Sequence, residues 1–255
     1  MAQRVPFYAS FKTIGHLNAA GDWLLYLSVF INIANVLIER LPVTDQTTTW
    51  KQIVTGLICL LAICCFLLDQ LSNYLFFCAN MWRRNDLFDN SLNTVLSEVI
   101  SEGYFSNDEI HPGIYKLGVN SFENTFLTLA VVKEQLRSSV IKLAIVVIVM
   151  LFAIIFGPNE WFIVLIQLAI PFVIAQQTIR LLLLKNRLAM ILDSFKQTFA
   201  LPRGQAQDNY IINAMTNYEA TMAWASIKLS DKLFDEANSL ISGQWIELKK
   251  RLNIQ

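Results

Sequence analysis

Four apolar runs constrain this chain more than any other feature of its sequence. They cover Trp23–Ile38, Ile53–Ala79, Val140–Phe156 and Trp161–Leu184. The run Val140–Phe156 is dense in Ile and Val and contains only Lys142 as a charged residue. Hydrophobic residues make up 55% of the chain and charged residues 16%, whereas soluble domains carry roughly 25% charged residues. The sequence therefore predicts an all-α integral membrane protein.

Short polar connections pair these runs into two helical hairpins. The Thr-rich segment Leu41–Gln52 joins the first pair, and Gly157–Glu160 is a tight helix breaker between the last two runs. Of the 20 basic residues, only Lys51 lies in these two turns, and only Arg40 directly precedes the first of them. Because Lys and Arg resist translocation, we expect four transmembrane helices, with both hairpin tips outside the cell and both termini in the cytoplasm.

The polar segments around the hairpins predict helical cytoplasmic regions. The expected organisation is a cytoplasmic segment at 1–21, hairpin 1 at 22–79, a helical insertion at 80–139, hairpin 2 at 140–184 and a helical C-terminal domain at 185–255. We expect the insertion to be interrupted at Gly103, at His111-Pro112-Gly113 and at Gly118.

The C-terminal domain should contain a long amphipathic helix. The fourth helix is expected to continue to about Ala200 and to stop at Leu201–Gly204, after which Asp208 could cap the next helix. An apolar stripe with steps of three and four residues follows, formed by Ile211, Met215, Tyr218, Met222, Ala225 and Leu229. Such a stripe packs against another helix, either within the chain or in a second copy.

Residues for catalysis are scarce, so we expect no enzymatic activity and no cofactor. The two histidines, His16 and His111, are far apart, and the sequence contains no Gly-rich phosphate loop and no nucleophile elbow. The four cysteines lie in one apolar run and are interpreted as small apolar residues. The acidic pairs Asp86/Asp89 and Asp108/Glu109 are interpreted as solvated helix faces or turns rather than acid–base machinery.

Polar residues inside the apolar runs are candidates for an intramembrane site. Ile53–Leu68 rises about 24 Å as a helix, so Asp69 should lie near the cytoplasmic boundary. It is either an interfacial structural residue or part of a water-filled path with Gln70 and Asn73. Asp22 is expected to be the N-cap of the first membrane helix.

Three glutamines in the fourth run have two possible roles. Gln167, Gln176 and Gln177 could form hydrogen bonds between helices, which stabilise membrane bundles. They could also line a pore if several copies assemble into a homo-oligomer.

Three phrases in the central segment carry a family resemblance: RNDLFDNSL at 84–92, GYFSN at 103–107 and NSFEN at 120–124. Placed between two hairpins, they resemble the four-helix transmembrane effectors of bacterial anti-phage systems, especially those encoded beside retron reverse transcriptases. The resemblance implies a toxin of the bacterial inner membrane. Such a toxin would be held inactive by a reverse transcriptase with its RNA-linked DNA (msDNA), and its release would damage the membrane and cause abortive infection.

The polar residues of these phrases could be regulatory or structural. They are Asp86, Asp89, Asn90, Tyr104, Asn107, Asn120, Glu123 and Asn124. They either help the cytoplasmic body to hold the inhibiting partner or only maintain its fold. For the whole chain, the alternatives to a retron effector are a cyclic-oligonucleotide-gated effector, a constitutive channel or transporter, and a membrane scaffold for a cytosolic partner.

Overall fold

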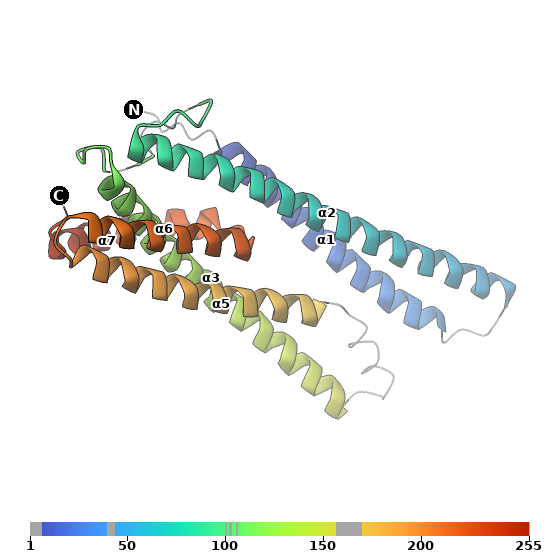
Figure 1. Cartoon of the computed structure of the whole chain (residues 1–255). Coiled ribbons are helices and arrows are strands. Elements are labelled where there is room, and N and C mark those ends of the chain that lie inside the picture. Colours follow the sequence, from blue (N-terminus) through green and yellow to red (C-terminus); the bar gives the residue numbers. More distant parts are fainter. Residues whose placement is uncertain are drawn as a thin grey trace. The chain divides into compact units, whose positions relative to one another are not determined.

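All the secondary structure that the computed structural model describes is α-helical (Figure 1). The described residues are 7–39, 44–99, 101, 104–105, 107–156 and 170–254. The helices are α1 (Tyr8–Glu39), α2 (Asp45–Leu92), α3 (Ile114–Phe156), α5 (Ile170–Phe199), α6 (Gln205–Ala225) and α7 (Asp231–Arg251). The all-α prediction is confirmed for this part of the chain.

The chain divides into two compact units. The first, which we call the helical body, comprises Met1–Phe11, Phe76–Ser138 and Ile179–Gln255. The second, which we call the apolar unit, comprises Lys12–Leu75 and Ser139–Thr178. Helices α1, α2, α3 and α5 each contribute residues to both units, so the chain passes between the units without leaving helical structure.

Two described helices are long and apolar enough to cross a membrane, rather than the predicted four. The candidate spans are Thr48–Leu92 in α2 and Ile114–Phe152 in α3, by length and composition. Large apolar side chains on both are exposed, including Ile53, Ile63, Phe66, Ile145, Ile148 and Phe152. Of the other two predicted spans, residues 161–169 lie outside the described part of the chain.

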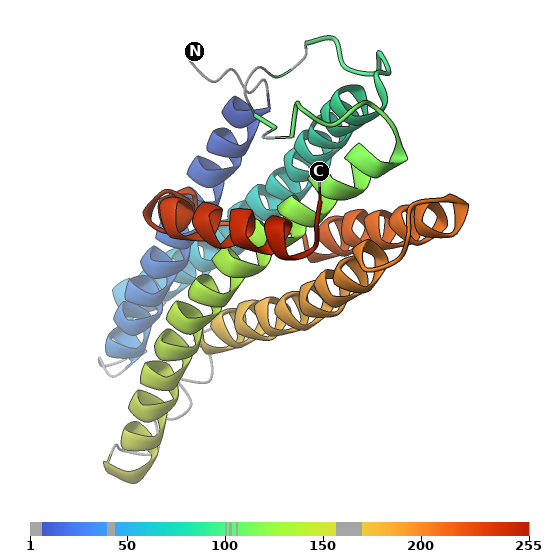
Figure 2. The same ribbon diagram turned by 90° about the vertical axis from the view of Figure 1, so that its left-hand side faces the viewer.

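Helix α1 begins well before the predicted cap at Asp22. The helix starts at Tyr8, so Asp22 lies in its interior and is not its N-cap. The mixed segment before Asp22 is helical because it packs: the side chain of Ile14 is fully buried, and Asn18 accepts a 2.6 Å hydrogen bond from Ser72 of α2. Figures 1 and 2 both show α1 lying alongside α2.

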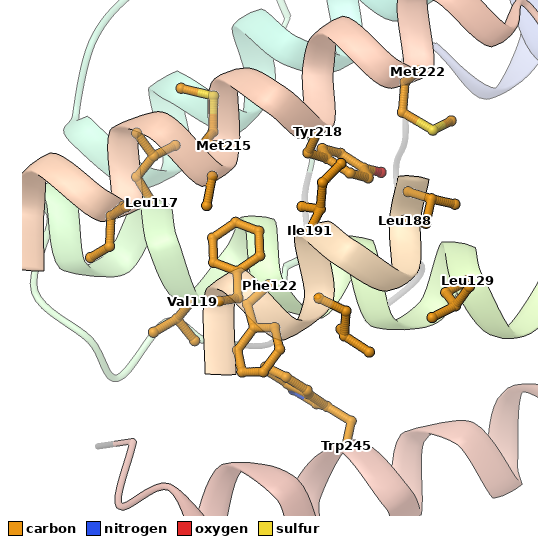
Figure 3. Packing of buried hydrophobic residues seen from close by; sticks show 14 of the residues in the cluster. Leu117, Val119, Phe122, Leu129, Leu188, Ile191, Met215, Tyr218, Met222 and Trp245 are labelled. Atoms are coloured by element: carbon orange, nitrogen blue, oxygen red, sulfur yellow. The ribbon is translucent and has the colours of Figure 1, made fainter. Parts of the chain in front are cut away.

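Aromatic stacking forms the centre of the helical body. The ring of Phe122 on α3 stacks on Phe195 and Phe199 of α5, each at 5.5 Å between centroids. Trp245 of α7 meets the same ring edge-on at 5.1 Å (Figure 3). One aromatic side chain thus joins three helices of the body.

The stripe predicted on α6 packs inside the chain. Ile211, Met215, Tyr218, Met222 and Ala225 are all buried in the core of the body, and Leu229 packs against that core. The alternative in which this stripe is the contact between two copies is therefore wrong. Because only one face of this helix is buried, its apolar residues recur in the sequence with the helical period of three and four residues.

Several helix ends differ from the predicted positions. Helix α2 ends at Leu92, where Asn93 takes a left-handed conformation with φ of 57° and donates its N–H to the carbonyl of Asp89. Helix α6 begins at Gln205 after Gly204, so Asp208 lies in its first turn and is not the cap. Gly118 does not interrupt the insertion, because it lies within α3, close to Ile211.

Candidate functional site

The polar group at the end of the second apolar run is local to α2. Asn73 and Gln70 donate to the same carboxylate oxygen of Asp69, at 3.1 and 3.3 Å. The side chains of Asp69 and Gln70 are exposed. Gln70 and Asn73, which the sequence grouped with Asp69, therefore both contact its carboxylate, in an arrangement that satisfies this group without a second helix.

The described structure does not bring the three glutamines of the fourth run together in one site. Gln176 and Gln177 are exposed on α5, and Gln167 lies outside the described residues. A contact that sequence reasoning missed lies beside them: the hydroxyls of Ser139 on α3 and Thr178 on α5 are 2.7 Å apart. Small hydroxyl residues at helix contacts give no periodic signal of their own.

Asp86 and Asp89 hold the segment that follows α2. Both lie in the part of α2 that belongs to the helical body, and both are buried. Asp86 accepts from the backbone N–H and the hydroxyl of Ser101, at 2.9 and 2.5 Å. Asp89 accepts from the N–H groups of Leu96 and Ser97, at 2.8 and 2.7 Å, and from the hydroxyl of Thr94. The solvated-face interpretation of this pair is wrong, because the carboxylates replace backbone partners in an irregular segment.

These hydrogen bonds change the acidity of Asp89. Desolvation acts against its carboxylate, but the bonds from Leu96, Thr94 and Ser97 favour the charged form more strongly. The pKa of Asp89 therefore lies below its ordinary value of 3.8. The carboxylate is charged at neutral pH and acts as a fixed acceptor.

Asn120 is the hub of a second network in the same body. Its amide nitrogen donates to Asn90 at 3.0 Å and to Ser91 at 2.9 Å, and its amide oxygen accepts from Asn107 at 2.9 Å. Asn107 also donates to Glu123 at 2.7 Å. The structure thus brings together residues from all three phrases that carry the resemblance.

The C-terminal helix reaches this network through a lysine that the sequence did not single out. Lys249 of α7 donates to Asn107 at 2.8 Å and to Glu109 at 2.6 Å. The hydrogen bond from Lys249 is the main cause that lowers the pKa of Glu109. The network therefore links the insertion to α7 as well as to α2.

A buried ion pair connects α2 with α6. Arg83 donates from Nη2 to both carboxylate oxygens of Glu219, at 2.8 and 2.7 Å. Burial disfavours the charged guanidinium, yet Glu219 and neighbouring tyrosines hold the pKa of Arg83 above its ordinary value. Arg83 also lies 5.7 Å from the ring centre of Tyr218.

A cavity of about 390 Å³ opens beside this ion pair. Its lining includes Arg83, Tyr104, Glu123, Asn124, Thr128 and Phe234. Burial raises the pKa of Tyr104 to about 12, so its hydroxyl stays protonated at neutral pH. The amide nitrogen of Asn124 is buried and has no hydrogen-bond partner among the described residues.

The cavity is lined by only part of the predicted motif. Of the predicted motif residues, Tyr104, Glu123 and Asn124 line it, whereas Asp86 and Asp89 bind backbone elsewhere in the body. Among the described residues, no group of three or more His, Cys, Asp or Glu side chains could hold a metal ion.

No family model, curated protein or solved structure matches the chain.

Proposed function

We propose that this chain is a toxic membrane effector of a bacterial anti-phage system of the retron type. Its four apolar runs form two transmembrane hairpins in the inner membrane, with both termini and the helical body in the cytoplasm. A reverse transcriptase with its msDNA holds the body in an inactive state. Release from this partner lets the membrane helices, alone or as a homo-oligomer, disrupt the bilayer and arrest the infected cell.

The observation that carries the proposal is the exposure of the apolar faces of α2 and α3. Ile63, Phe66, Ile148 and Phe152 are each more than half exposed, and such surface is costly in water. A lipid bilayer would remove this cost. In the same two helices, residues that belong to the helical body are buried in its core, for example Leu87 and Phe122. A change in the body is therefore in a position to act on the membrane helices through continuous backbone.

The central test is expression of the chain alone in a bacterial host, with membrane potential followed by a voltage-sensitive dye. We expect depolarisation and growth arrest. Ile148→Lys places a charge on the exposed apolar face of α3, where insertion would cost about 3 kcal/mol, and should abolish the effect. Tyr210→Lys, at an exposed position of α6 in the body, is the matched control. Polarised, growing cells that contain the wild-type chain in their membranes would contradict the proposal.

The topology has its own test. A tag inserted at Asn159 should be reachable from outside the inner membrane, and a tag after Gln255 only from the cytoplasm. A tag at Asn159 reachable only from the cytoplasm would exclude the two-hairpin arrangement.

The partner can be tested through the neighbouring open reading frames. Co-expression with an adjacent reverse transcriptase and its noncoding RNA should suppress depolarisation and restore growth. An adjacent nucleotidyltransferase in place of a reverse transcriptase would instead indicate control by a cyclic oligonucleotide.

A further inference from the structure

Helix α5 is apolar on two opposite faces in the part that belongs to the helical body, which begins at Ile179. One face enters the core through Leu184 and Leu188, which are fully buried. On the opposite face, Ile179, Leu183 and Met190 are 55%, 44% and 66% exposed. Helix geometry places these three side chains within about 40° of one another around the axis. A helix that is apolar all round is buried in protein or in contact with lipid.

Two arginines lie beside this exposed apolar stripe. Arg180 and Arg187 are both exposed and are two turns apart on α5, so they share one side of the helix. Among the described residues, no carboxylate forms an ion pair with either guanidinium. From Ile170 to Leu192, α5 contains 3 basic residues and no acidic one. The positive charge of this surface is therefore not neutralised within α5.

A tryptophan of α6 completes the surface. The guanidinium carbon of Arg187 lies 4.1 Å from the ring centre of Trp224, which is 45% exposed. This cation–π contact stabilises the guanidinium beside the ring, and an arginine in such a contact can still bind phosphate oxygens through its planar set of donors. Tryptophan is itself enriched at the interface between membrane and water. We call this surface the α5–α6 patch; its residues are Ile179, Arg180, Leu183, Arg187, Met190 and Trp224.

The α5–α6 patch lies at the predicted cytoplasmic end of the fourth membrane span. That span is predicted to end at Leu184, so Arg187 is about 4.5 Å further along the helix axis. The headgroup layer of a bilayer is roughly 5–8 Å thick on each side. Arg187 therefore reaches the depth of the lipid phosphates. This step rests on the proposed function, because it takes the fourth apolar run as a membrane span.

The apolar part of the patch selects lipid over nucleic acid. Arginine binds the phosphates of both, but contact with a nucleic-acid backbone would leave Ile179, Leu183 and Met190 beside polar and charged groups. A bilayer places hydrocarbon directly below its phosphates and so removes such side chains from water. We propose that the α5–α6 patch binds anionic phospholipid headgroups of the cytoplasmic leaflet and so attaches α6 to the membrane surface.

The test uses the full-length chain in nanodiscs of phosphatidylcholine with a brominated lipid, because bromine quenches tryptophan fluorescence only at short range. The chain has 6 Trp residues, so the signal of Trp224 is taken as the difference between the wild type and Trp224→Phe. Quenching by brominated phosphatidylglycerol and by brominated phosphatidylcholine gives the preference of the site for the anionic lipid. We expect a preference of at least about fivefold, the factor that one arginine contributes near an anionic surface.

Two variants of Arg187 separate its charge from other effects. Arg187→Gln should lower the preference for phosphatidylglycerol about fivefold, while Trp224 stays quenched by both lipids. Arg187→Lys keeps the charge and should retain most of the preference. Lys232→Gln makes the same change of charge at an exposed position of α7, outside the patch, and should leave the preference unchanged. The subtraction of Trp224→Phe is repeated in each background.

Four outcomes would overturn the proposal. They are no quenching of Trp224 by either lipid, equal quenching by both lipids in the wild type, full preference in Arg187→Gln, and displacement of both lipids from Trp224 by a single-stranded oligonucleotide, which would assign the patch to nucleic acid. A chain that depolarises cells but has no lipid preference at Trp224 loses only this inference. A chain with the preference that leaves cells polarised loses only the toxic-effector proposal.

Discussion

Arg83 and Glu219, separated by 136 positions in the sequence, form a charge-assisted contact between α2 and α6 in which one guanidinium nitrogen serves both carboxylate oxygens. Their side chains are only 10% and 11% exposed. Removing one partner of such a pair leaves a buried charge, whereas replacing both by apolar residues is often tolerated. The two replacements therefore separate the cost of an unpaired charge from the net contribution of the pair.

We expect Glu219→Leu to lower the free energy of unfolding by about 3–5 kcal/mol. The double variant Arg83→Met/Glu219→Leu should lie much closer to the wild type. Chemical unfolding of the chain in detergent micelles measures both. Lys196→Met, which breaks the exposed pair with Asp193, should change stability by less than about 1 kcal/mol. Equal costs for Glu219→Leu and Lys196→Met would show that the buried pair has no special role.

The depressed pKa of Asp89 predicts a dependence of stability on acid. A carboxyl group with a lower pKa in the folded than in the unfolded state stabilises the fold above its unfolded pKa, and this contribution is lost as the pH falls through the folded pKa. For Asp89 the loss should therefore begin as the pH falls below about 4. Asp89→Asn should be less stable than the wild type at pH 7, and the difference should shrink at pH 3.

Hydrogen exchange localises the effect of Asp89→Asn. The amides of Leu96 and Ser97 should exchange faster in the variant, because the carboxylate accepts from both. The exposed Asp193→Asn should leave these two amides unchanged. A stability difference for Asp89→Asn that stays constant from pH 7 to pH 3 would contradict the assignment.

The sequence was informative where a pattern is local and periodic. The apolar steps from Ile211 to Ala225 predicted a buried helix face, and every residue of that stripe is in the core. Asp69 and Asn73 are four positions apart on one helix, so their contact could also be expected. In these cases helix geometry alone brings the side chains together.

Contacts between distant segments gave no such signal. Neither Arg83 nor Glu219 belongs to a motif, and Lys249 reaches Asn107 across 142 positions. Local rules also failed at Asp22 and Asp208, which are good cap residues but lie inside helices. There, packing of the preceding segment extends the helix beyond the position that the cap preference favours.

At Gly118, too, packing outweighs a local sequence preference, since this glycine lies inside α3 rather than ending it. This position gives a third prediction. A β-carbon at this position would lie 2.9 Å from three side-chain atoms of Ile211, which is fully buried. Alanine gains about 1 kcal/mol of helix propensity over glycine, but overpacking a core costs about 1–3 kcal/mol. Because Ile211 is β-branched and enclosed, it cannot easily move. We expect Gly118→Ala to destabilise the chain by about 1 kcal/mol, as measured by chemical unfolding.

Two further variants check the cause. Gly243→Ala in α7 meets no atom within 4 Å and should be neutral or stabilising. In an Ile211→Ala background, Gly118→Ala should also become neutral or stabilising, since the opposing atoms are gone. A cost of Gly118→Ala that persists in that background would exclude the clash as its origin.

The last prediction concerns the attachment of α7 to the rest of the helical body. Trp245 is 3% exposed and packs edge-on against Phe122, whereas its neighbour Ile246 is 52% exposed. Trp245→Ala should lower the free energy of unfolding by about 3–5 kcal/mol, and Ile246→Ala by less than about 0.5 kcal/mol. Limited proteolysis should then cut Trp245→Ala, but not Ile246→Ala, between Ser226 and Ser230. If both variants resist the protease equally, the polar contact of Lys249 with Asn107 and Glu109 is sufficient to hold α7, and the aromatic contact is not what fixes it to α3.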